Sequence, residues 1–269
     1  EFQRIIDRFF HNCKERGYPE DVTREVWRQI ESFAAYSFSK AHSASYAVES
    51  FQSLYLKAYF PREFMVAVIN NFGGFYATWV YINEAKRWGA TIHLPCVNNS
   101  NYKTCIKGKD VYLGFIHMND FERAVAKAIE PERDRLGKFQ DLDDFIGRIK
   151  VGIQQLILLI RMNAFRFTGK SKSTLLWEAH MLLGKKDPKD IQDQLFKLPR
   201  KKFNLPNLHN SKIEDAFDEV ELLGYPITVS FFDLLKTNFR GEIKASDLSK
   251  HIGKKVRMIG QLVVIKYVR

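Results

Sequence analysis

The sequence predicts a mainly α-helical fold with one small β insert, and three observations support this prediction. Apolar residues recur at helical spacing near the start of the chain, as at Ile5, Ile6 and Phe9. Between residues 91 and 116 the pattern changes to short strand-like runs around a Gly-Lys-Asp turn. From residue 120 to residue 183, short helical segments alternate with tight turns. We therefore expect helices to form most of the structure.

The first 88 residues predict five helices. A turn at residues 16–20 separates two amphipathic helices, and Asp21 suits the N-cap of the second. A third helix precedes Pro61, which opens a fourth, and a fifth ends near Trp88 and Gly89. These helices define a predicted helical segment over residues 1–90.

The stretch from residue 36 to residue 59 joins a polar front half to an amphipathic helix. Ser43 is the predicted N-cap, which would gather Lys40 and His42 at the positive helix start. Such a start suits a phosphate group. Alternatively, the front half is an ordinary polar loop that leads into a core helix. The helix should be buried along one stripe, formed by Ala47, Phe51, Leu54, Tyr55 and Ala58.

Beyond residue 116 the pattern indicates further helices, then a change in character. The predicted helices cover residues 120–130, 142–149, 152–162, 173–183 and 213–223. Residues 184–210 contain three prolines and little periodicity, which is typical of an extended basic connector. The β-like run at residues 255–269 predicts a strand without its closing partner. With no initiator methionine at the start, we expect the sequence to be a fragment of a longer protein.

Composition favours a soluble protein with an anionic partner. The chain has 269 residues, 45% of them hydrophobic, and a formal net charge of +11, which points to nucleic acid or a membrane surface. No apolar run is long enough to cross a membrane. Cys13, Cys96 and Cys105 are too scattered for a disulfide framework or a zinc site. We interpret them as reduced thiols, which predicts a cytoplasmic location.

The motifs resemble one known family. Residues 36–47 (YSFSKAHSASYA) and 53–65 (SLYLKAYFPREFM) resemble the fingers of the C-family bacterial replicative DNA polymerases, the DNA polymerase III alpha subunits. The resemblance continues through residues 84–89, 94–98 and 162–165. It implies six segments: helical fingers (1–90), a β insert (91–116), a helix-hairpin-helix-like domain (117–183), a basic linker (184–210), a helical connector (211–253) and the first strand of an OB-fold (254–269).

The resemblance also implies a nucleotide-binding role for the loop before the third helix. Lys40 would meet the triphosphate charge, His42 the triphosphate or base edge, and Ser43 would donate from its hydroxyl. Tyr46 would contact the nascent base pair. Catalysis in such polymerases uses Mg2+ held by palm carboxylates, which the resemblance puts upstream of Glu1. This fragment alone should therefore be inactive.

The acidic residues Asp141, Asp143 and Asp144 are the tightest acidic cluster of the sequence. Acidic residues near a helix N-terminus are favoured by the helix dipole, so we interpret them as a solvated helix start. Metal ligation is the less favoured alternative.

The family carries a helix-hairpin-helix where this chain has residues 114–129. The turn at residues 117–122 (HMNDFE) lacks the expected glycines, and its two acids would oppose phosphate. We therefore favour a structural hairpin over a direct DNA grip. Basic residues around it could still contact the DNA backbone as an unspecific surface: Arg148, Lys150, Arg161, Arg166, Lys170 and Lys172.

A sliding-clamp-binding pentapeptide is indicated at residues 192–196 (QDQLF). Leu195 and Phe196 would enter a groove of the clamp, with Gln192 bonded at its rim. The alternative is that the apolar pair folds back onto this chain.

Together these features predict a segment of a replicative DNA polymerase. Its partners would be template-primer DNA, a deoxynucleoside triphosphate, the sliding clamp and other replisome subunits. Two alternatives stay open: an error-prone translesion paralogue of the same family, and a noncatalytic basic DNA-binding scaffold.

Overall fold

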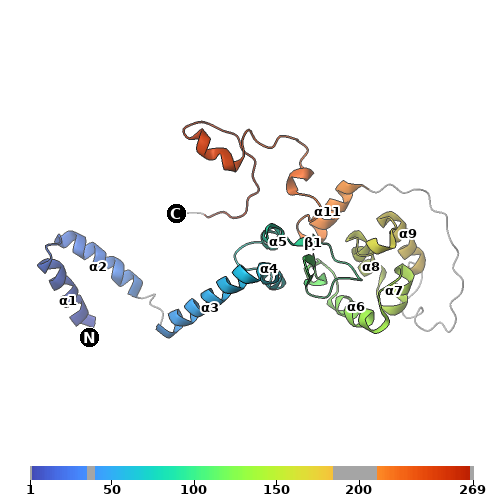
Figure 1. Ribbon diagram of the computed structural model, residues 1–269, viewed down its shortest axis with the longest axis horizontal. Helices are drawn as coiled ribbons and strands as arrows, with labels where there is room; N and C mark the ends of the chain where they lie inside the picture. Colours follow the sequence, from blue (N-terminus) through green and yellow to red (C-terminus); the bar gives the residue numbers. More distant parts are fainter. Residues whose placement is uncertain (1, 35–39, 184–210, 267–269) are drawn as a thin grey trace. The chain divides into compact units, whose positions relative to one another are not determined.

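The computed structural model describes residues 2–34, 40–183 and 211–266 (Figure 1). The chain divides into two compact units. Unit 1 is Glu1–Ala58 and unit 2 is Tyr59–Arg269. The predicted segment 1–90 therefore spans both units. The predicted linker at residues 184–210 lies outside the described residues.

Unit 1 contains α1 (Phe2–Glu15), α2 (Glu20–Ala34) and most of α3 (Lys40–Tyr59). The rings of Phe9 and Phe10 lie 5.1 and 6.1 Å from the ring of Trp27, which joins α1 to α2. Among the described residues of unit 1, Thr23 alone is buried. This helical pair therefore has aromatic contacts but almost no enclosed core.

Two details predicted for α3 are wrong. The helix begins at Lys40, so Ser43 lies within its first turn and is not the N-cap. Lysine and alanine are strong helix formers, so Lys40 and Ala41 extend the helix past the serine. The stripe predicted to be buried is also open, since Phe51 and Leu54 are 74% and 62% exposed. No described element of unit 1 covers that side of the helix.

Unit 2 begins with α4 (Pro61–Asn70) and α5 (Thr78–Arg87), which pack on a three-stranded sheet. The strands are β1 (Thr91–His93), β2 (Cys105–Lys107) and β3 (Asp110–Tyr112), in the order β1-β3-β2. β1 pairs with β3 in parallel, and β2 with β3 antiparallel. A small apolar cluster joins helices and sheet: Met65, Val66, Ala85, Ala90 and Val111. The predicted β insert is confirmed.

The chain leaves β3 through Gly114, where only glycine fits. A Cβ atom at this position would lie 2.3 Å from the carbonyl carbon of Lys103. The short helix η1 (Phe115–His117) follows directly. Gly114 thus lets the segment after β3 run tightly against the segment before β2.

The next helices are α6 (Arg123–Leu136), α7 (Leu142–Arg148), α8 (Ile153–Arg161) and α9 (Lys172–Leu183), with η2 (Arg166–Thr168) before α9. All four were predicted, but α6 continues six residues past its predicted end, in spite of Pro131. Asp141 caps α7 by accepting a 2.8 Å hydrogen bond from the backbone N–H of Asp144. The interpretation of the acidic cluster as a helix start is confirmed.

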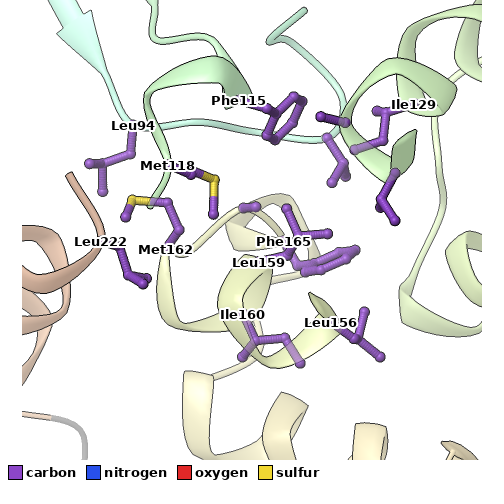
Figure 2. Close-up of a cluster of buried hydrophobic side chains, with 14 of the residues drawn as sticks. Leu94, Phe115, Met118, Ile129, Leu156, Leu159, Ile160, Met162, Phe165 and Leu222 are labelled. Carbon is purple, nitrogen blue, oxygen red and sulfur yellow. The ribbon is translucent and has the colours of Figure 1, made fainter. Parts of the chain in front are cut away.

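The main core of unit 2 is assembled around α8 (Figure 2). Leu156, Leu159 and Ile160 of α8 are fully buried. They pack against Leu94, which directly follows β1, and against Phe115 of η1 and Ile129 of α6. Leu222 of α11 (Lys212–Leu223) completes this side of the cluster. Because α11 contributes to this cluster, this helix is part of the same folded body as α8.

The chain beyond α11 is irregular. Gly224, with φ of 87°, ends α11, and the short helices η3 (Phe231–Leu234) and η4 (Ala245–His251) follow. The strand predicted at residues 255–269 is wrong over its described part, where only an isolated bridge joins Gly241 to Met258. A strand without neighbours lacks the ladder of hydrogen bonds that stabilises it. The OB-fold assignment stays a prediction.

Candidate nucleic-acid interface

The turn at residues 117–122 is held by bonds to the rest of unit 2. Asn119 donates from its backbone N–H to Leu222 O at 2.8 Å and from Nδ2 to Glu221 O at 3.0 Å. Gln155 of α8 accepts from the N–H of Glu122 and donates to the carbonyl of Asp120. Asp120 has a φ of 57°, a conformation that favours glycine. The turn is therefore bonded to the rest of unit 2 through its amides at Asn119 and Glu122, although Asp120 and Glu122 are exposed.

His117, the first residue of this turn, is buried and bonded to Thr104. Its Nε2 lies 3.0 Å from the hydroxyl of Thr104, which also accepts a bond from the N–H of Gly114. Asn70 of α4 bonds both backbone groups of Thr104. Burial lowers the pKa of His117 to about 4, because the imidazolium would lose its hydration there. The imidazole is therefore neutral at physiological pH.

Two of the six basic residues predicted at the DNA backbone form an ion network between α8, α9 and α11. Arg161 pairs with Glu221 and, at 2.7 Å, with Asp218, and the hydrogen bonds to Glu221 and then Asp218 raise the pKa of the guanidinium. Lys172 is buried and lies 2.7 Å from Asp215 and 3.1 Å from Asp218. Their charges are neutralised within the unit.

Three more of these basic residues have internal partners. Arg148 is 9% exposed; it pairs with Asp144, donates to Gly137 O and stacks on Phe139. Arg166 donates to the carbonyls of Leu94 and Pro95, and Lys170 pairs with Glu178 at 2.6 Å. Lys150 differs, because it is exposed and has no ion pair among the described residues.

A cationic surface that the sequence did not single out lies on the first turns of α6. Arg123 and Lys127, one turn apart, lie 5.8 and 5.4 Å from the ring centroid of Tyr102. Both cations are exposed, and among the described residues neither has a carboxylate partner. The i, i+4 spacing of Arg123 and Lys127 at a helix start could have indicated this cationic surface from the sequence. The contribution of Tyr102 could not be predicted, because Tyr102 precedes both residues by more than twenty positions.

The residues predicted to bind a nucleotide lie at the start of α3. His42 and Tyr46 are one helical turn apart, with ring centroids at 4.5 Å in an edge-to-face arrangement. Tyr46 is 58% exposed, and Ser43 lies in the same exposed first turn. Lys40 is the first residue of the helix, but its side chain lies outside the described residues.

Comparison with known proteins gives two kinds of match. A helix-hairpin-helix motif model matches residues 89–175, the region from the sheet to the start of α9. The chain is 30% identical to the DNA polymerase III subunit alpha of Aquifex aeolicus over 240 residues, which is 88% of this chain and 20% of the relative. The chain is homologous to the DNA polymerase III alpha subunit over most of its length.

Other DNA polymerase III alpha subunits give the same result. The Thermus aquaticus subunit is 31% identical over 66% of this chain and 16% of its own length. A Staphylococcus aureus subunit is 34% identical over 62% of this chain, again with 16% of its own length covered. The chain thus spans a fifth or less of the length of these relatives.

The resemblance to DNA polymerase III alpha subunits also implies clamp-binding residues and a Mg2+ site. The clamp-binding residues Gln192, Leu195 and Phe196 lie outside the described residues. Within the described ranges, no cluster of three or more His, Cys, Asp or Glu side chains is suited to a metal ion. The carboxylates of Asp141 and Asp144 cap α7 and pair with Arg148. No described helix is long and apolar enough to span a membrane.

Proposed function

We propose that this chain is the fingers-to-clamp-side segment of a bacterial replicative DNA polymerase. It would position the incoming deoxynucleoside triphosphate and the template-primer DNA, and tether the enzyme to the sliding clamp and the replisome. The observation that carries this proposal is the 30% identity to a DNA polymerase III alpha subunit across 88% of the chain. Mg2+ would supply metal-assisted nucleotidyl transfer at palm carboxylates, which the described residues do not provide.

The N-terminal turn of α3 supports the nucleotide-positioning part. The first amides of a helix point outward without intrahelical partners, and the helix dipole is positive there, so this end favours a phosphate. His42 and Tyr46 project from the same side of this end, since residues four apart share a helix face. An aromatic ring one turn beyond a phosphate site suits the base or sugar of the same nucleotide.

Protection of Lys40 from acylation tests this role. With primed duplex present, a deoxynucleoside triphosphate should slow acylation of Lys40 at least threefold, measured by mass spectrometry of peptides from the full chain. Lys14, exposed on α1 in the same unit, serves as the control and should react at an unchanged rate. Equal rates at Lys40 with and without nucleotide would remove the nucleotide role.

Duplex binding tests the DNA-positioning part. Fluorescence anisotropy with a labelled primed duplex should give binding that weakens steeply with salt, because bound cations release condensed counterions. Lys150→Gln should reduce the slope of log K against log salt concentration by about one if this exposed lysine contacts a phosphate. No detectable binding by the parent chain at 50 mM salt would overturn the DNA role.

The clamp tether is tested with purified bacterial sliding clamp. Leu195→Ala combined with Phe196→Ala should abolish clamp binding in surface plasmon resonance, because the apolar anchors of the peptide are lost. Phe203→Ala combined with Leu205→Ala removes the same two side-chain types from the same connector and serves as the matched control. If both double variants bind alike, residues 192–196 are not the tether.

A further inference from the structure

The exposed side of α6 carries both cations and small residues. Arg123 and Lys127 alternate with Ala124 and Ala128, and all four are exposed. No long side chain stands at the two alanine positions, so a large partner can approach the helix closely between the cations. The residues on the opposite side, Val125, Ala126 and Ile129, are buried in the core of unit 2.

The position of Arg123 is unfavourable for the helix itself. It is the first residue of α6 and directly follows the N-cap Glu122, and no further acidic residue lies in the first turn. A cation at this end opposes the helix dipole, which favours acids there. Glu122, the N-cap of α6, offsets part of this unfavourable interaction, and a bound anion would offset more of it.

The backbone at Tyr102 is held in place beside these cations, and its ring is partly buried against the core of unit 2. The guanidinium of Arg133, two turns further along α6, donates to Val97 O, Ser100 O and Asn101 Oδ1 at 3.0, 2.7 and 2.6 Å. Tyr102 O accepts from the N–H of Ile116 at 2.9 Å. The loop is thus fastened along α6, and the ring of Tyr102 limits the motion of both cationic side chains by cation–π attraction.

On this basis, and resting on the proposed DNA role, we propose that Arg123 and Lys127, presented by Tyr102, bind the phosphate backbone of duplex DNA. The neighbouring turn at residues 117–122 is engaged with α8 and α11, and its exposed acids Asp120 and Glu122 repel phosphate. The duplex therefore contacts the flank of α6 instead of the hairpin turn. Glu130, one turn beyond Lys127, marks the end of the cationic surface.

The test removes the two charges from the full chain. Arg123→Gln combined with Lys127→Gln should weaken binding to a labelled duplex by a factor of roughly ten to one hundred at 0.1 M salt. The slope of log K against log salt concentration should fall by about two, since each phosphate contact contributes about 0.9. Tyr102→Leu, which keeps both charges but loses the ring, should weaken binding about two- to fivefold.

Two controls keep the result specific. Lys212→Gln combined with Lys244→Gln removes the same net charge from exposed positions elsewhere in unit 2 and should leave the slope within about 0.5 of the parent. Exchange of the cations, Arg123→Lys with Lys127→Arg, should restore the slope. Circular dichroism melting curves verify that each variant is folded.

The outcomes separate this inference from the proposed function. If the parent binds duplex and the double variant matches the Lys212 and Lys244 control, the α6 contact is wrong but the DNA role stands. If the parent itself does not bind duplex, both are overturned. A reduced slope that the exchanged variant does not restore would show that folding, not charge, is responsible, and would also overturn the contact.

Discussion

Lys172 and Lys127 are lysines of the same folded unit, yet their surroundings are opposite. Lys172 is buried on α9 between Asp215 and Asp218 of α11. Lys127 is exposed on α6, with the ring of Tyr102 beside it and no carboxylate partner among the described residues. A count of basic residues therefore does not locate a DNA interface. The position of the acids does, because paired cations hold the protein together and unpaired cations remain for a ligand.

Removal of the buried lysine should give the largest effect. Lys172→Ala leaves Asp215 and Asp218 without this cation, and removal of one partner from a buried pair typically costs about 3 kcal/mol or more. Urea unfolding followed by circular dichroism should show a lower midpoint with an unchanged slope. Duplex affinity, measured under conditions where the variant is folded, should change less than for the α6 double variant.

The matched control is Lys170→Ala on the neighbouring turn. Lys170 pairs with Glu178 on the surface, and its side chain is 41% exposed, so the loss should be at most about 1 kcal/mol. Similar losses for Lys170→Ala and Lys172→Ala would contradict the distinction between internal and external cations.

The internal role of the hairpin turn predicts a pH-dependent stability that comes from His117. The pKa of His117 is about 4 in the folded protein and near 6.5 in the unfolded chain, so between these values only the unfolded state binds the proton. Stability should therefore fall by about 2 kcal/mol as the pH decreases from 6.5 to 4.5. The contribution is constant above pH 7.

The variant His117→Gln should remove this part of the pH dependence, because glutamine does not titrate and can still bond to Thr104. Urea midpoints at several pH values measure the difference between parent and variant. Phe72→Leu alters the ring that packs edge-to-face on His117 and should keep the parental slope. A His117→Gln variant with the parental slope would show that this histidine does not control the hairpin.

Local patterns predicted the helices and the sheet well, while distant partners decided what the sequence missed. The strand pair β2 and β3 was predictable because its turn lies between the strands at Gly108. The partner of Arg161, Asp218, lies 57 residues away, so a basic residue that looked exposed is internal. The extension of α6 has the same origin, since Arg133 bonds to carbonyls 33 and 36 residues away.

The candidate site was predictable only in part for the same reason. The cations of α6 were visible in the sequence, but Tyr102 comes beside them only through the fold. The family resemblance predicted a helix-hairpin-helix turn at residues 117–122, but this turn contains no glycine. In the structure Asp120 still has the left-handed backbone that favours glycine.

A glycine restored to the turn at residues 117–122 should change stability only slightly. Asp120→Gly relieves the strain of a side chain at φ of 57°, and the gain is partly offset by the greater freedom of glycine in the unfolded chain. The expected net stabilisation is about 0.5 kcal/mol. Asn163→Gly, at φ of 59°, should give a similar gain without any change of charge. If the duplex contacts α6 and not the turn, both variants should bind DNA with the parental salt slope. A slope that steepens by about one for Asp120→Gly alone would put a phosphate at the turn itself, and the contact assigned to α6 would then have to be shared with the hairpin.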